Sequence, residues 1–136
     1  MTDARRGETV HGVDAQLARH GKVSYMHIPA TDVVRSGDFY AKVFGWDVRG
    51  DYSPDRRGFT DASGELIGAF VTNIPVAAAA GVEPYIYVEH IDAVALDIEA
   101  HGGTIVNRVA AEGDLWVATF RDPAGNTIGI WQAGPR

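Results

Sequence analysis

Apolar and polar residues alternate in the first half of the chain in a pattern that predicts short strands around one helix. Residues 23–29 predict a strand, and Asp32 is placed to cap a helix that runs to about Phe44 and ends at Gly45. Shorter strands are predicted at residues 46–50, 59–61 and 65–72. Residues 1–22 carry charge and glycine with few apolar positions, so we expect an N-terminal tail or a weak short helix.

The second half of the chain repeats this order of elements. A strand is predicted at residues 85–89, and the helix after it places Ile91, Val94 and Ile98 on one face before two glycines end it. Further strands are predicted at residues 104–107, 115–121 and 126–132. Prolines in residues 73–84 forbid a continuous strand there, so this segment is expected to be a linker.

The letters of the sequence repeat as well. FTDASGELIGAF, which starts at Phe59, aligns with FRDPAGNTIGIW, which starts at Phe120, and Phe, Asp, Gly, Ile and Gly coincide. The motifs that begin at Asp61 and Asp122 are typical of turns between antiparallel strands. We therefore predict one domain of two equivalent modules, residues 23–72 and 85–132, joined by the linker.

Alternation along the strands separates two sets of side chains, because neighbours on a strand point to opposite faces of a sheet. The aliphatic set, expected to carry the helices, is Met26, Ile28, Ile67, Ala69, Val71, Ile86, Val88, Ile128 and Ile130. The aromatic and polar set contains Tyr25, His27, Phe70, Glu83, Tyr85, Tyr87 and Trp131, with Gly68 and Gly129 among them. Aromatic rings with polar tips suit a ligand cavity, and a glycine within a strand often marks a close approach of a ligand or of backbone. A half-exposed sheet surface or a dimer interface is the alternative interpretation of this face.

Composition limits the classes of partner. The chain of 136 residues has 12 basic and 18 acidic side chains, a formal net charge of −6 and a pI near 5.2. An acidic domain is poorly suited to nucleic acid or to anionic lipid, and we expect neither as a partner. The absence of cysteine excludes disulfides and thiolate sites and suits a reducing compartment. The sequence contains no apolar stretch long enough to cross a membrane and no secretory signal, so we expect a cytoplasmic protein.

The order and spacing of several fragments resemble the vicinal oxygen chelate superfamily, which includes glyoxalase I, extradiol dioxygenases and the fosfomycin and bleomycin resistance proteins. The fragments are HIPATD, FYAKVFGW, YIYVEHID, HGG and FRDPAGNTIGIWQ, which together span residues 23–132. The resemblance implies an α+β fold in which two βαβββ modules form a curled mixed sheet around a cavity. The helices are then expected on the outer face of this sheet, and a homodimer often completes or supports the cavity.

Chemically active members of the superfamily hold a metal at four positions, which correspond here to Tyr25, Gly68, Glu83 and Gly129. Two glycines supply no side-chain ligand, and a neutral tyrosine is a poor one, so only Glu83 is an ordinary donor. We therefore expect no metal and no cofactor.

Two functional hypotheses follow. The first is a protein that binds a small, planar, largely apolar molecule without a metal, with Tyr25, His27, Phe70, Glu83, Tyr85, Tyr87 and Trp131 as ligand-binding residues. The bleomycin resistance branch, as the resemblance suggests, sequesters a drug in such a cleft, and an antibiotic or a metabolite is the corresponding ligand here. The second is a lyase or isomerase that uses a displaced metal site at His27 and Glu83, or His27 alone as acid and base. No GxSxG or GxGxxG motif is present, so nucleophilic hydrolysis and dinucleotide binding have no support.

Overall fold

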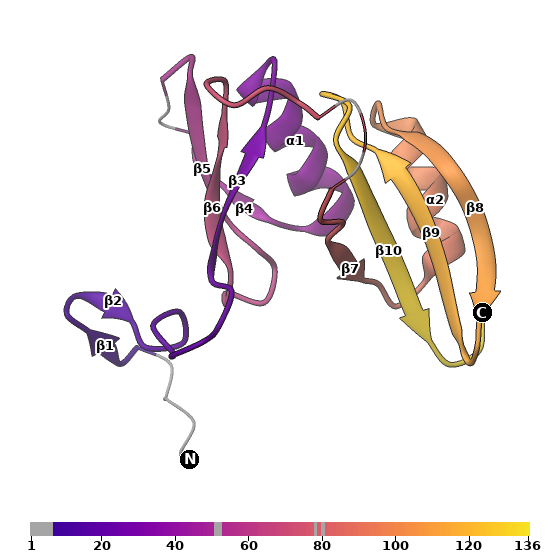
Figure 1. The fold of residues 1–136 in the computed structure, drawn as a ribbon, viewed down its shortest axis with the longest axis horizontal. Helices are drawn as coiled ribbons and strands as arrows, with labels where there is room; N and C mark the ends of the chain where they lie inside the picture. Colours follow the sequence, from indigo (N-terminus) through magenta and orange to yellow (C-terminus); the bar gives the residue numbers. More distant parts are fainter. Residues whose placement is uncertain (1–6, 51–52, 78, 80) are drawn as a thin grey trace.

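The first module folds into one helix and one four-stranded sheet (Figure 1). The computed structural model describes residues 7–50, 53–77, 79 and 81–136 of the chain. The elements of this module are β3 (Tyr25–Pro29), α1 (Val33–Phe44), β4 (Asp47–Val48), β5 (Arg56–Thr60) and β6 (Ile67–Val71). The strand order of this sheet, sheet one, is β3-β6-β5-β4, with β3 parallel to β6 and the other neighbours antiparallel.

Local signals set both ends of α1. The carboxylate of Asp32 accepts the backbone N–H groups of Val34 at 3.0 Å and of Arg35 at 3.2 Å, which satisfies two donors that the helix leaves free. Gly45 follows the helix with φ at 71°, a left-handed conformation that glycine adopts without a steric penalty. The predicted start and end of this helix are confirmed.

The second module repeats the same topology in sheet two. Its elements are β7 (Tyr85–Tyr87), α2 (Ile91–Ala100), β8 (Thr104–Glu112), β9 (Leu115–Arg121) and β10 (Thr127–Ala133). The strand order is β7-β10-β9-β8, and β7 runs parallel to β10. The α+β class and the two βαβββ modules are therefore confirmed.

Strand β8 is longer than its sequence pattern predicts. The alternation that supports a strand stops near Asn107, whereas the strand continues to Glu112. Its register with β9 shifts between Ile105 and Asn107, and again between Asn107 and Ala110. Each irregularity adds a residue that breaks the alternation of apolar and polar side chains, so the pattern of the sequence does not predict this part of the strand.

The two sheets stay separate within the chain, and α1 packs between them rather than on the outer face of one curled sheet (Figure 1). The ring of Phe120 on β9 lies 5.9 Å from the ring of Phe39 and 5.8 Å from that of Phe44, both on α1. The aliphatic face of sheet two needs an apolar cover, and the aromatic residues of α1 provide it. One face of each sheet is left open.

The register between β3 and β6 corrects the predicted position of Phe70. Ile28 pairs with Phe70, so both side chains point toward α1, and Phe70 is fully buried. Its ring lies 5.4 Å from that of Tyr40 and 5.1 Å from that of Phe59. The prediction that Phe70 shares a face with Tyr25 is wrong, because alternation fixes two faces within a strand and only the register matches them to the next strand. The aliphatic residues that share the open face of sheet one with Tyr25 and His27 are instead Ile67, Ala69 and Val71.

In sheet two the predicted faces are correct. Tyr85 pairs with Gly129 and Tyr87 pairs with Trp131, so these residues share one face. Ile86 pairs with Ile130 on the other face, and Ile130 is fully buried in the core.

The N-terminal segment forms a small hairpin of β1 (Thr9–Val10) and β2 (Val13–Asp14) rather than a helix. His11 and Gly12 join the strands with φ of 50° and 82°. Positive φ at both residues is what a two-residue hairpin turn needs to match the right-handed twist of its strands. Residues 1–6 of the expected tail, and residues 78 and 80 of the expected linker, lie outside the described residues. Among the helices of the described residues, none is long and apolar enough to cross a membrane.

A buried carboxylate joins the two modules. The Tyr40 hydroxyl donates to Oδ2 of Asp122 at 2.9 Å, and Oδ1 accepts the backbone N–H groups of residues 124–126. The Asn126 amide donates to Oδ2 at 2.8 Å and also to the Pro29 carbonyl at 2.7 Å. The sequence predicts only a turn at this position, whereas the structure makes it a junction between α1, β3 and the β9–β10 turn.

Candidate ligand-binding site

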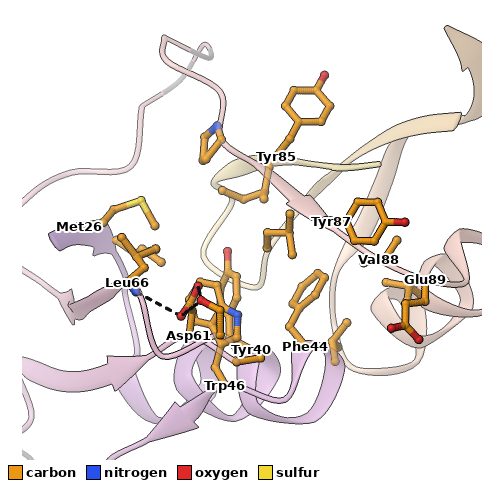
Figure 2. A pocket seen from close by; sticks show the side chains of 18 of the residues that line it. Met26, Tyr40, Phe44, Trp46, Asp61, Leu66, Tyr85, Tyr87, Val88 and Glu89 are labelled. Atoms are coloured by element: carbon orange, nitrogen blue, oxygen red, sulfur yellow. Dashed lines mark hydrogen bonds between the residues drawn. The ribbon is translucent and has the colours of Figure 1, made fainter. Parts of the chain in front are cut away.

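A cleft of about 820 Å³ lies between the two modules, and we call it the inter-module cleft. Figure 2 shows Tyr40, Phe44 and Trp46 beside α1 on one side of this cleft, with Tyr85 and Tyr87 of β7 across from them. Met26 and Leu66 of module one line it as well. Most of these side chains are apolar or aromatic, as in pockets for small organic molecules.

The floor of the cleft is a stack of aromatic rings. The rings of Tyr40 and Trp46 stack at 4.6 Å, and the far side of Trp46 stacks on Phe59 at 4.8 Å. Tyr40 and Phe59 are fully buried, and 7% of Trp46 is exposed. Because packed neighbours hold the ring of Trp46 in place, the floor is ordered before any ligand arrives.

Tyr40 supports the floor as a neutral phenol. Burial first, and then the charge and hydrogen bond of Asp122, raise the pKa of Tyr40 well above its usual value of 10.0. Its hydroxyl proton is donated to Asp122 and is not available to a ligand. We therefore assign Tyr40 a positioning role.

Tyr85 forms part of the opposite wall and lies over Gly129. A Cβ atom built on Gly129 would meet the ring of Tyr85 at 2.3 Å, so only glycine leaves room for this ring. The Tyr85 hydroxyl donates to Oε1 of Glu83 at 2.9 Å. This hydrogen bond, followed by partial burial, raises the pKa of Tyr85 from its usual value of 10.0. The predicted close approach at Gly129 is thus made by a side chain of the protein.

Tyr87 connects the wall to the open face of sheet two. Its ring meets that of Trp131 edge to face, with centroids 4.8 Å apart and planes at 78°. Half of Tyr87 is exposed, so this pair presents aromatic surface to a ligand or to another molecule.

The seven predicted ligand-binding residues do not meet at one place. Tyr85 and Tyr87 line the cleft, Glu83 holds the hydroxyl of Tyr85, and Trp131 lies beside Tyr87. The remaining three lie elsewhere: Tyr25 and His27 are on the open face of sheet one, and Phe70 is in the core.

Sequence reasoning missed part of the cleft. Met26, Phe44 and Trp46 also line the cleft. Large apolar residues of this kind ordinarily belong to a core, so the sequence gives no reason to assign them to a binding site. Glu89 and His90 also line the cleft, and their position directly after the β7 strand was the available signal. Asp61 and Glu89 give the cleft two carboxylates, and among the described residues that line it there is no lysine or arginine.

The four positions that hold a metal in active members of the superfamily do not fit a cation in this chain. Gly68 is on the opposite face of sheet one from Tyr25, between the Met26 carbonyl and the ring of Phe59. Gly129 lies beneath Tyr85, as described above. Within residues 7–50, 53–77, 79 and 81–136, no three His, Asp or Glu side chains are grouped closely enough to hold a metal ion. The predicted pair of His27 and Glu83 is likewise not observed, because each is hydrogen-bonded within its own module.

A comparison with protein families matches residues 25–131 to the glyoxalase-like domain. The chain belongs to this family. Membership of the glyoxalase-like family confirms the expected place in the vicinal oxygen chelate superfamily, and the match covers both modules.

Individual relatives of this glyoxalase-like chain are more distant. It is 29% identical over 123 residues to the CFP32 protein of Mycobacterium tuberculosis; the match covers 85% of this chain and 47% of that protein. The chain thus spans about half the length of the first curated relatives it matches.

Two solved structures share the fold. One is a glyoxalase/bleomycin resistance protein/dioxygenase family enzyme from Burkholderia phytofirmans, with a TM-score of 0.72, 20% identity and coverage of 84% of this chain and 100% of that chain. The other is TnmS3, an antibiotic binding protein from a Streptomyces species, with a TM-score of 0.65, 20% identity and coverage of 84% and 97%.

Proposed function

We propose that this glyoxalase-like protein binds a small, planar, largely apolar molecule in the inter-module cleft without a metal. One observation carries the proposal: a cleft of about 820 Å³ lies between a rigid floor of stacked rings in module one and strand β7 of module two. Because Tyr40 and Phe59 cover the two faces of Trp46, a flat aromatic molecule meets the exposed edge of this ring and lies against the other apolar residues of the lining, such as Phe44, Leu66 and Ile86. The two carboxylates of the lining, Asp61 and Glu89, favour a neutral or cationic ligand over an anionic one.

The size of the surface sets the expected affinity. A ligand that buries roughly 200 Å² of apolar surface gains about 5 kcal/mol at about 25 cal/mol per Å². One good ring contact adds about 1 kcal/mol, so the dissociation constant should lie in the tens of micromolar.

The comparisons support this class of function. TnmS3, which shares the fold, is an antibiotic binding protein. An antibiotic or an aromatic metabolite is therefore the ligand class to test first, and sequestration of such a molecule requires no chemical step.

We also infer a cytoplasmic homodimer. The acidic composition without cysteine supports a reducing compartment. The exposed fraction of Tyr25, 47% on the open face of sheet one, supports a second copy as its cover.

Tryptophan fluorescence tests the ligand proposal, because Trp46 lies in the cleft and Trp116 lies outside its lining. The wild-type protein is titrated with a panel of polycyclic aromatic antibiotics and with the neutral probe 2-naphthamide. We expect saturable quenching that is lost in Trp46→Phe and retained in the matched control Trp116→Phe. Tyr85→Ala should weaken binding about fivefold through the loss of one ring contact. The absence of a saturable response to every probe, or binding that survives Trp46→Ala together with Tyr85→Ala, would refute the proposal.

A further inference from the structure

Strand β7 is the end strand of sheet two, so only one of its two edges is paired. The strand order β7-β10-β9-β8 places β10 on one side of it and no strand of the described residues on the other (Figure 1). An unpaired strand edge presents a row of backbone N–H and C=O groups to which a second extended chain can bond. We call this side of β7 the free edge.

The hydrogen bonds to β10 show which backbone groups stay unpaired. The Pro84 carbonyl accepts from β10 and the Val88 N–H group donates to β10, each at 2.9 Å. The N–H and C=O groups of one strand residue point to the same edge, and successive residues alternate between the two edges. Pro84, Ile86 and Val88 therefore face β10, whereas Tyr85 and Tyr87 direct four backbone groups to the free edge. No hydrogen bond within the described part of the chain reaches these four groups.

The free edge faces the inter-module cleft. Side chains alternate along a strand, so a pocket against one face of a sheet is lined by every second residue. Strand β3 shows this pattern, because Met26 and Ile28 line the cleft and His27 between them does not. On β7 the lining is continuous, and every residue from 84 to 90 contributes to it. Continuous lining is expected where a cleft runs along the backbone edge of a strand and the side chains of both faces form its rims.

The free edge lacks the features that commonly prevent strand addition. Native edges are often blunted by charged side chains or bulges, or are covered by a helix or a loop. The residues of β7 are tyrosine, isoleucine and tyrosine, all with high strand propensity, and their pairing with β10 is regular. Module one lies across a cleft of about 820 Å³ instead of against this edge.

We propose that the inter-module cleft binds a short, extended, apolar peptide that adds a strand to the free edge of β7. The backbone of the peptide bonds to the four groups of Tyr85 and Tyr87. Its alternate side chains pack beside these two rings on one face and beside Ile86 and Val88 on the other. The three residues of β7 span about 10 Å at about 3.3 Å per residue, which suits a peptide of three or four residues.

This inference rests on the proposed function in one respect, because both place the ligand in the same cleft. It adds that the peptide backbone is the feature that the cleft recognises. The probe is acetyl-Val-Phe-Val-Lys-amide, whose β-branched and aromatic residues favour an extended chain. Its lysine suits a cleft that is lined by the carboxylates of Asp61 and Glu89.

Calorimetric titration with this peptide and two N-methylated forms tests strand addition. One form carries N-methyl groups on both valines, and the other carries them on the phenylalanine and the lysine. The N–H groups of an extended chain alternate between its edges, so only one of the two sets faces β7. We expect one methylated form to bind at least about tenfold more weakly than the parent and the other to bind within about twofold of it. Equal effects of the two forms, or no saturable binding of the parent, would overturn the proposal.

Tyr87→Pro removes one N–H group from the free edge. Proline is tolerated on an edge strand where its nitrogen faces away from the ladder, so the bonds to β10 are kept. The matched control is Tyr87→Ala, which loses the same ring and keeps the N–H group. We expect the peptide to bind Tyr87→Pro about fivefold more weakly than Tyr87→Ala, and 2-naphthamide to bind the two equally. Equal peptide affinity of the two variants, with circular dichroism showing both folded, would contradict strand addition.

Amide hydrogen exchange of the wild-type protein locates the peptide without any substitution. The N–H groups of Tyr85 and Tyr87 should exchange faster than that of Val88, which is bonded to β10. With the peptide at ten times its dissociation constant, exchange at Tyr85 and Tyr87 should slow about tenfold, and unchanged exchange would overturn the proposal. Protection of both groups without peptide that is lost on dilution of the protein would identify a second copy of the chain as the occupant, and would overturn the assignment of a peptide.

2-Naphthamide separates failure of this inference from failure of the proposed function. It has a planar ring system and one amide, so it cannot extend along a strand. If it quenches Trp46 saturably while the peptide does not bind, strand addition is refuted and the planar ligand stands. If the peptide binds with the alternate sensitivity to methylation while 2-naphthamide gives no response, strand addition is supported and the planar ligand is refuted.

Discussion

The hydrogen bond between Tyr40 and Asp122 gives a sharp test of how the two modules are held together. The two residues are 82 positions apart, and the phenol is fully buried while 4% of the aspartate is exposed. The variants are Tyr40→Phe, Asp122→Asn and the double variant. Tyr40→Phe removes one donor and leaves Oδ2 its bond from Asn126 at 2.8 Å, so no new unsatisfied group is buried.

The expected magnitude follows from this geometry. A hydrogen bond to a charged group contributes about 1.5–3 kcal/mol, so Tyr40→Phe should lower the free energy of unfolding by about 2 kcal/mol. For a chain of 136 residues this corresponds to a fall in Tm of roughly 7 °C. Asp122→Asn should cost more, about 3 kcal/mol, because the carboxylate also accepts three backbone N–H groups. The double-mutant cycle should give a coupling of about 1–2 kcal/mol.

The pH dependence supplies an independent check. The pKa of Tyr40 is raised in the folded state, so above about pH 10 the unfolded chain releases a proton that the native protein keeps. Stability is therefore fully present below pH 10 and is lost as the pH rises toward the native pKa, by about 1.4 kcal/mol for each pH unit. The difference between wild type and Tyr40→Phe should shrink by about that amount between pH 9 and pH 11.

Urea denaturation followed by circular dichroism at pH 7, 9 and 11 measures all of these quantities. A destabilisation by Tyr40→Phe of less than about 0.5 kcal/mol at pH 7, or a difference that does not change with pH, would refute the role assigned to this bond.

Substitution by alanine should destabilise the protein far more at Gly68 than at Gly129, the two glycines that the repeat places in equivalent positions. In Gly68→Ala the new Cβ would lie 1.9 Å from a backbone carbonyl and 2.7 Å from the ring of Phe59, so we expect a loss of about 3 kcal/mol or more, or no soluble protein. In Gly129→Ala the obstacle is the ring of Tyr85, which can rotate toward solvent, so the loss in urea denaturation should stay below about 1 kcal/mol, and the reverse ranking would contradict this reasoning. Glu83→Gln should lower the pKa of Tyr85 toward 10.0, measured as the absorbance at 295 nm that is absent in Tyr85→Phe; an unchanged titration would show that Glu83 does not hold this hydroxyl.

The sequence by itself determined the local elements and their repetition. The cap at Asp32, the left-handed stop at Gly45 and the common motif of the two modules are signals that act within a few residues. The resemblance to a known superfamily rests on the same fragments. In sheet two the alternation also placed Tyr85 and Tyr87 on the correct face, because each pairs directly with a residue of β10.

Only the tertiary structure decided which faces meet. The register of β3 against β6 moved Phe70 into the core, and the packing of α1 between the sheets made Trp46 the floor of a cleft. It also placed Arg56 beside Tyr25, although 31 residues separate them. Helix caps and alternation depend on interactions between residues that are close in the sequence. Strand register and the order of the layers depend instead on how the apolar surface of the whole chain is buried, and no local sequence pattern encodes that.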